Sequence, residues 1–89
     1  MTYSLAIRPA LDEKLRKLFK KNRKHYEIIL KKAGEIVENP QHYKNLHAPL
    51  QHLKRVHVDN SFVLTFSVNE NKKVVTLEDF DQHDNIYLL

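Results

Sequence analysis

The chain of 89 residues contains no cysteine and a single glycine, and both shortages narrow what it can do. Without cysteine it forms neither a disulfide framework nor a thiolate metal site, which is typical of a reducing compartment. One glycine excludes the glycine-rich loops that cradle phosphates. No apolar run approaches the length of about 20 residues that spans a membrane, and Met1-Thr2-Tyr3 lacks the basic start of a signal peptide. We expect a cytoplasmic protein with one domain over residues 1–89.

The formal net charge of +4 is spread unevenly along the chain. Residues 1–24 carry eight Lys or Arg and two acidic side chains, whereas residues 59–89 carry two and six. A basic N-terminal part favours a polyanion or an acidic protein as the partner.

The spacing of apolar residues in the first half predicts a strand followed by two helices. Alternating side chains predict a strand over Tyr3–Ile7. Pro9 suits the first turn of a helix, and apolar residues then recur at helical spacing as far as Lys21. A second helix is expected over His25–Glu38 and ends at Asn39-Pro40, because a residue before proline avoids helical backbone angles. The two helices should form an antiparallel hairpin.

The central stretch 53–68 predicts a β-hairpin. Asp59-Asn60-Ser61 supplies its turn, since Asn and Asp tolerate unusual backbone angles and bond their own backbone. Residues 41–52 before it are expected to form a loop that Leu46 and Leu50 hold to the core.

The last third predicts one further strand. Val74–Leu77 is rich in β-branched residues, and residues 80–85 are expected to form a loop before Ile86–Leu89 ends the chain. The order β-α-α-β-β-β predicts an α+β fold, in which a helix hairpin packs on one face of a mainly antiparallel four-stranded sheet.

Two polar side chains of the hairpin form the sharpest functional candidate. Side chains on a strand alternate, so Arg55 and His57 face away from the core to which the neighbouring valines point. A neutral imidazole takes a proton from a hydroxyl near neutral pH, and an arginine binds a phosphate by paired hydrogen bonds. With His83 and Tyr87, this set suffices for metal-free RNA cleavage by 2′-hydroxyl attack. The alternative is a solvated sheet face with Tyr87 as a terminal anchor.

Four histidines recur every five residues, but their spacing does not indicate a metal site. It matches neither the HExxH motif nor a zinc-finger pair, and two of the four lie within the expected loop. We therefore expect no metal and no cofactor. The four are His42, His47, His52 and His57.

The first helix and its link to the second carry seven basic residues in eleven, with no acid among them. Such a surface favours binding to nucleic acid or to the ribosome through phosphate contacts, and the alternative is a solvated surface. The seven are Lys14, Arg16, Lys17, Lys20, Lys21, Arg23 and Lys24, of which Lys17, Lys20, Lys21 and Lys24 are the candidate contacts.

Taken together, the order and spacing of several motifs resemble the RelE/ParE superfamily of toxins from type II toxin–antitoxin pairs. The resemblance covers nearly the whole chain and is nearest to archaeal RelE-like members and to the histidine-using YafQ-like and YoeB-like branches. The motifs are Y-x-L-x-I in the first strand, A-x-x-x-K-L-x-K-L in the first helix, the N-P after the second helix, H-A-P-L in the loop, L-K-R-V-H-V-x-x-S-F-V-L-T-F in the hairpin and H-D-x-I-Y near the end.

This resemblance implies a toxin that enters the ribosomal A site and cuts mRNA there, and so inhibits translation. It also implies an acidic, RelB-like antitoxin that wraps the toxin, which is then a monomer within the toxin–antitoxin complex. Carried over by position, it implies a site made of Arg55, His57, His83 and Tyr87, with Lys54 as a further phosphate ligand and His47 near a further acid or base.

The chain also departs from the family pattern across the hairpin. Many relatives carry R-x-R-x-G-x-Y-R, whereas here the second arginine is His57, the glycine is Asp59 and the last arginine is Phe62. We therefore expect histidine chemistry in place of a dense arginine–lysine site. ParE relatives share the fold but poison DNA gyrase without cutting RNA, so two alternatives stay open. They are a non-enzymatic gyrase inhibitor and a binding module that only pairs with its antitoxin.

Overall fold

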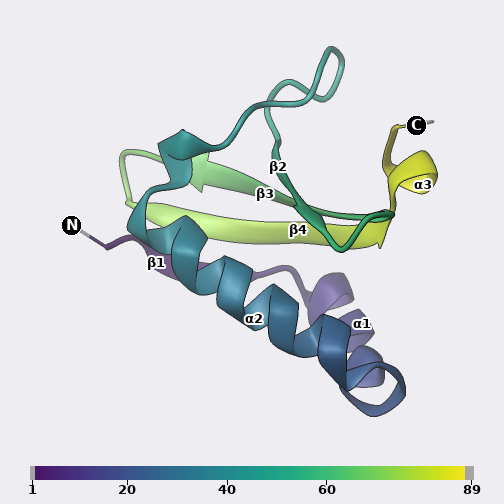
Figure 1. Cartoon of the computed structure of the whole chain (residues 1–89). Helices are drawn as coiled ribbons and strands as arrows, with labels where there is room; N and C mark the ends of the chain where they lie inside the picture. Colours follow the sequence, from purple (N-terminus) through teal and green to yellow (C-terminus); the bar gives the residue numbers. More distant parts are fainter. Residues whose placement is uncertain (1, 88–89) are drawn as a thin grey trace.

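The sheet has four strands in the order β1–β4–β3–β2, and the computed structural model describes it within residues 2–87, without the side chain of Tyr87. The strands are β1 (Ser4–Ile7), β2 (Lys54–Val58), β3 (Phe62–Asn69) and β4 (Val74–Gln82). Strand β1 runs parallel to β4, and the other two pairs are antiparallel (Figure 1). The predicted α+β fold with a mainly antiparallel sheet is confirmed.

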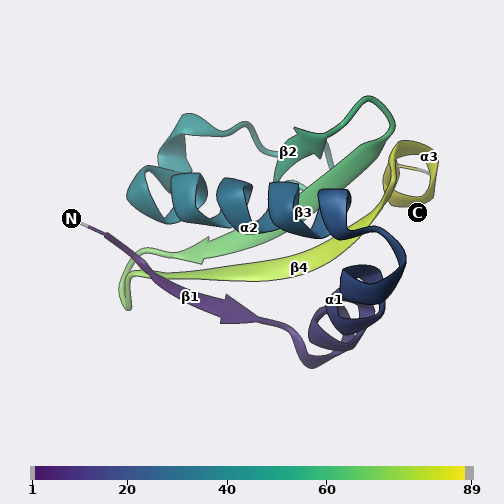
Figure 2. The same ribbon diagram turned by 60° about the horizontal axis from the view of Figure 1, so that its bottom comes forward.

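Two helices, α1 (Pro9–Lys21) and α2 (Arg23–Glu38), cover one face of this sheet (Figures 1 and 2). The bounds of α1 are those predicted, with Pro9 at its first position. Helix α2 begins two residues earlier than predicted, because the Asn22 side chain accepts a hydrogen bond from the His25 backbone N–H and caps it. No helix in the described part of the chain combines the length and apolar character needed to cross a membrane.

The main core lies between these helices and the sheet. Removing such side chains from water stabilises the fold by about 1.5–3 kcal/mol for each large apolar residue. The buried members are Leu11, Leu15, Ile29, Ala33, Ile36, Val58, Leu64, Phe66, Val75, Leu77 and Phe80.

A second, smaller apolar cluster lies on the opposite face of the sheet, which we call the open face. Leu46, Val63 and Ile86 are buried there, and Leu50 and Leu53 pack against them. The expectation that Leu46 and Leu50 hold their loop to the core is therefore met on this side rather than on the helix side. The loop itself begins with a short 3-10 helix, η1 (Pro40–His42).

The predicted loop over residues 80–85 is wrong. Strand β4 continues to Gln82, and a short helix, α3 (His83–Tyr87), follows it. Phe80 is buried in the main core opposite Leu64, which keeps this segment in the sheet. The strand also includes Glu78 and Asp79, which pair with Arg8 and Lys14 elsewhere in the fold. Leu88 and Leu89 lie outside the described residues.

Candidate active site on the open face of the sheet

Strand β2 presents Arg55 and His57 on the open face, as the alternation predicts. Arg55 lies opposite Thr65 and His57 opposite Val63 in the β2–β3 ladder. The intervening Val56 packs against the main core on the other face. His57 is exposed and Arg55 is half-buried.

His83 lies beside His57, although 26 positions of sequence separate them. Their rings stack with centroids 6.2 Å apart and an interplanar angle of 15°. The placement follows from the ladder, because β4 ends at Gln82 and the next backbone N–H, of His83, donates to Ser61 O at 2.7 Å. This bond brings the start of α3 to the β2–β3 turn. Two imidazoles therefore share one exposed site.

The guanidinium of Arg55 forms no hydrogen bond or ion pair with the side chains of residues 2–86 or with the described backbone. The carboxylates of Asp79 and Asp81, which lie opposite Thr65 and Val63 in the β3–β4 ladder, are bound by Lys14 of α1. Although burial opposes it, the hydrogen bond and charge of Asp79 raise the pKa of Lys14. Lys14 thus neutralises the two carboxylates of β4, and the Arg55 guanidinium is available for an anionic ligand such as a phosphate.

Two other residues implied by the resemblance, Lys54 and His47, do not join this group. Lys54 points to the opposite face of β2, where its ammonium donates to Tyr43 O and Asn45 Oδ1, each at 3.0 Å. His47 is exposed in the loop before β2, with no ring contact to His57 or His83 in the part of the chain described. The Tyr87 side chain lies outside the described residues, so its place in the site stays a prediction.

The basic run of the sequence divides into paired and exposed members. Lys14 bonds β4, Arg16 pairs with Asp12 at 3.2 Å, and Arg23 lies 3.7 Å from Glu27. Four lysines are exposed and form no salt bridge among residues 2–87, namely Lys17, Lys20, Lys21 and Lys24.

These lysines lie at the end of the molecule that also carries the histidine pair. The link between α1 and α2 is at the same end as α3 (Figure 1). The hydrogen bond from His25 is the main cause that lowers the pKa of the Asp59 carboxyl in the β2–β3 turn, and the nearby charge of Lys24 lowers it further. The exposed positive charge therefore reaches the turn beside which His83 sits.

A buried histidine that the sequence did not single out fixes this turn. His25 of α2 lies with Nε2 3.1 Å from Asp59 Oδ2, and its ring makes edge contacts with Phe62 and Phe80. Asp59 adopts a positive φ of 60°, as the turn prediction requires of an Asp or Asn. Because 34 positions separate the pair, no spacing pattern could have revealed it.

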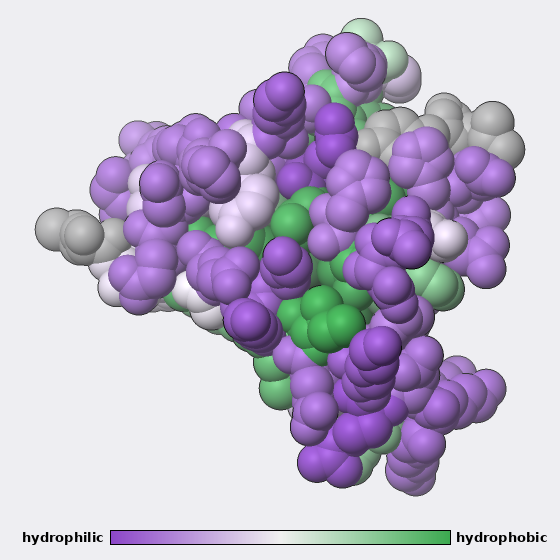
Figure 3. All heavy atoms as spheres, viewed as in Figure 1, coloured by the Kyte–Doolittle hydropathy of each residue, from purple (hydrophilic) through white to green (hydrophobic). Residues whose placement is uncertain are grey.

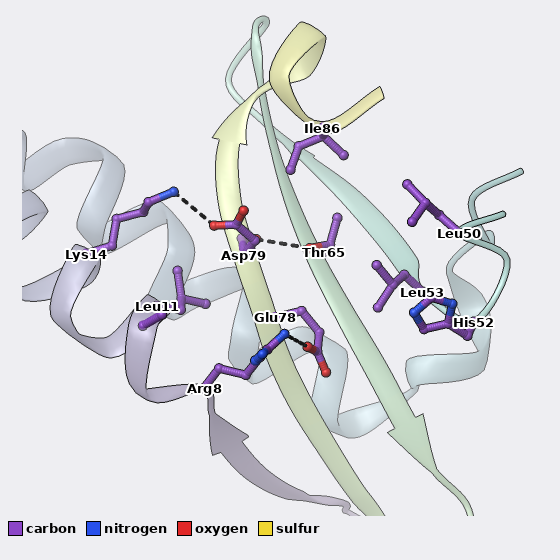
Figure 4. Close-up of a pocket in the computed structure, with 11 residues that line it drawn as sticks. Arg8, Leu11, Lys14, Leu50, His52, Leu53, Thr65, Glu78, Asp79 and Ile86 are labelled. Atoms are coloured by element: carbon purple, nitrogen blue, oxygen red, sulfur yellow. Dashed lines mark hydrogen bonds and ion pairs between the residues drawn. The ribbon is translucent and has the colours of Figure 1, made fainter. Parts of the chain in front are cut away.

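A cavity of about 470 Å³ adjoins this site on the open face (Figure 4). Leu50, Leu53 and Ile86 form its apolar side. Its polar side carries Glu78, whose oxygens accept from Arg8 Nη1 at 3.1 Å and Ser67 Oγ at 2.7 Å. Asp79 follows, bound to Lys14 Nζ at 2.9 Å. The residues described hold no cluster of three or more metal-ligating side chains.

Comparison with known proteins identifies the family. No family model matches the chain. It is 56% identical over 85 residues to a Methanocaldococcus jannaschii protein named "Putative toxin RelE4", with 96% of this chain and 90% of that one covered. An uncharacterized protein of Methanosarcina mazei is 62% identical over 85 residues, covering 96% and 99%. The chain belongs to the RelE family of toxins from toxin–antitoxin systems, and the family resemblance is confirmed.

Solved structures share its fold at low sequence identity. The toxin–antitoxin complex RelBE2 of Mycobacterium tuberculosis matches with a TM-score of 0.78 at 15% identity, over 93% of this chain and 100% of that chain. The RelE–RelB complex of Pyrococcus horikoshii matches with a TM-score of 0.69 at 20% identity, over 92% and 96%.

Proposed function

We propose that this toxin is a ribosome-dependent endoribonuclease that cleaves mRNA in the A site and so stops translation. The observation that carries the proposal is the stacked pair of His57 and His83 beside Arg55, whose charge no residue of the described chain neutralises. Because the proposed substrate is mRNA on a translating ribosome, the proposed place of action is the cytoplasm.

The chemistry needs one base, one acid and one cation. One imidazole takes the proton from a ribose 2′-hydroxyl, and the oxygen attacks the adjacent phosphorus. The bond from phosphorus to the 5′-oxygen breaks, and the second imidazole gives that oxygen a proton. The products are a 2′,3′-cyclic phosphate and a 5′-hydroxyl. Arg55 binds the non-bridging oxygens and stabilises the charge that builds on them in the transition state.

The exposed lysines provide the contact with the ribosome. The exposed lysines belong to the last turns of α1 and the start of α2, and the link between these helices is at the same end of the molecule as α3 (Figure 1). Phosphates attract such a surface regardless of sequence. Ribosomal RNA bound there would bring the mRNA across the open face. In this proposal cutting requires the ribosome because His57 and His83 are exposed and the ribosome holds the mRNA against them.

The proposed antitoxin is an acidic segment that folds on this toxin. A groove of about 490 Å³ runs between α1 and α2, with basic Arg16 and Lys20 among its lining residues. It includes Leu30 and Phe19, whose exposed fractions of 50% and 40% are high for large apolar residues. Figure 3 shows a further apolar patch over the middle of α2, ringed by hydrophilic side chains. An amphipathic acidic helix suits such surfaces.

The test is cleavage of mRNA on programmed ribosomes by the purified toxin, with no metal added beyond the Mg²⁺ that the ribosome itself requires, and with cut sites mapped by primer extension. Cuts confined to the A-site codon and absent on free RNA are expected. His57→Gln and His83→Gln should each slow cutting by about 100-fold or more, the usual contribution of a general acid or base. His42→Gln, which changes an exposed histidine of η1, should cut like the wild type.

Two results would overturn the proposal. One is wild-type cutting by both histidine variants. The other is a folded wild-type protein that leaves mRNA intact on the ribosome, in which case inhibition of gyrase supercoiling becomes the next measurement.

A further inference from the structure

The cavity on the open face continues the line of the proposed site along β2. Arg55 and His57 share one face of β2, about 6.6–6.8 Å apart along the strand, and Leu53 lies immediately before the strand begins. Leu53 lines the cavity, and so does Thr65, the ladder partner of Arg55. A nucleotide whose phosphate lies at Arg55 therefore has the histidine pair on one side and the cavity on the other.

The walls of the cavity fit an uncharged planar ring. Leu50, Leu53 and Ile86 offer an apolar surface on one side (Figure 4). The opposite side presents carboxylates, and both cations that line it, Arg8 and Lys14, are already bound to them. A phosphate would meet carboxylates whose Arg8 and Lys14 partners are already engaged, whereas the flat face of a base would pack on the leucines. The volume of about 470 Å³ lies within the range of pockets that accept small ligands.

Glu78 is the group in this cavity best fixed to recognise hydrogen-bond donors. Its side chain is 18% exposed, and each of its oxygens accepts one bond, from Arg8 or from Ser67. Those bonds orient the carboxylate, and each oxygen keeps a further lone pair. Guanine presents two parallel N–H donors that match two carboxylate oxygens. Uracil offers one N–H between two carbonyl groups, which a carboxylate repels.

We propose that this cavity binds the mRNA base next to the scissile phosphate, and that Glu78 makes the toxin prefer guanine there. The proposal rests on the proposed function, since it names the part of the substrate that the same site recognises. Glu78 acts as a specificity-determining residue and takes no part in the proton transfers.

The first experiment maps cleavage on ribosomes that carry mRNAs with every base at each position of the A-site codon. The wild type should favour guanine at one position beside the cut by about tenfold, as a paired hydrogen-bond contact provides. Glu78→Gln, which replaces one acceptor by a donor, should abolish that preference and keep cutting of the other codons. Glu35→Gln, the same change at an exposed position of α2, should leave the preference intact.

The second experiment separates this proposal from the proposed function and needs no cleavage. Guanosine and uridine are titrated into the wild-type protein, and the methyl signals of Leu50, Leu53 and Ile86 are followed by NMR. Larger shifts with guanosine support the base pocket even if the protein cuts no RNA, and this readout also stands if Glu78→Gln fails to fold. Equal responses to the two nucleosides, or guanine preference unchanged in a folded Glu78→Gln protein, would overturn it.

Discussion

Replacing Ile86 by alanine tests how α3, which carries His83, is held to the sheet. Ile86 is 4% exposed and packs with Leu46 and Val63 in the second cluster, apart from the main core. Other attachments of α3 are polar, such as the bond from Asn85 Nδ2 to Asp81 Oδ1 at 2.9 Å. We therefore expect Ile86→Ala to release α3 without unfolding the sheet.

The size of the effect follows from burial and from the small extent of α3. Truncating a buried isoleucine to alanine costs about 2–5 kcal/mol in a packed core. Since α3 has five residues and only a small apolar surface against the sheet, the destabilisation should appear as local opening rather than global unfolding. At about 2 kcal/mol, the population of the open form rises by about 30-fold.

Amide hydrogen exchange measures that population residue by residue. In Ile86→Ala, exchange of the α3 amides should accelerate by about 30-fold or more, while β3 and β4 keep their protection. The matched change Ile36→Ala, at a fully buried position of α2 in the main core, should lower protection throughout. Unchanged α3 exchange in Ile86→Ala, or equal deprotection across the sheet in both variants, would refute the separation of the two clusters.

Two further changes probe the charged groups. Asp59→Asn weakens the interaction with His25. The hydrogen bond from His25 lowers the pKa of the Asp59 carboxyl. The contribution of this pair to the free energy of unfolding is therefore present above the ordinary carboxyl range and disappears as pH falls through the lowered pKa. Urea unfolding from about pH 7 to about pH 2 should find the wild type more stable at neutral pH and the difference vanishing in acid; a constant difference would contradict this. Ribosome co-sedimentation at several salt concentrations gives the slope of the logarithm of the association constant against the logarithm of salt concentration. Replacing Lys17, Lys20, Lys21 and Lys24 by Gln should reduce the size of that slope by about 0.7–0.9 for each phosphate that the lysines no longer neutralise. Lys31→Gln with Lys72→Gln is the control, and an unchanged slope would exclude these lysines from the ribosome-binding surface.

Local sequence signals were enough to predict the elements whose ends are marked by a proline or by turn-forming residues. Pro9 set the start of α1, and the Asp59 turn set the central hairpin. Strand β4 extends to Gln82, beyond the predicted Val74–Leu77, and this extension includes Glu78 and Asp79. Only the tertiary partners Arg8 and Lys14, some 65–70 positions away, make those charges compatible with a strand.

The same limit applies to the candidate site. Alternation along β2 was enough to place Arg55 and His57 on one face, and the same alternation puts Lys54 on the other. The stacking of His57 on His83 depends on the β3–β4 register and on where β4 ends, which no spacing encodes. The roles of these residues in catalysis stay predictions.

The parallel pairing of the first strand with the last has a consequence for how the toxin is made. Ser4 lies beside Val74, and Arg8 meets Glu78 across 70 positions of sequence. Residues 74–77 must therefore be synthesised before β1 finds its partner in the sheet, and non-local pairing of this kind is slow to form. His83 follows them in the chain. A nascent chain that has not reached these residues therefore lacks both the finished sheet and the pair of His57 and His83 that makes up the candidate site.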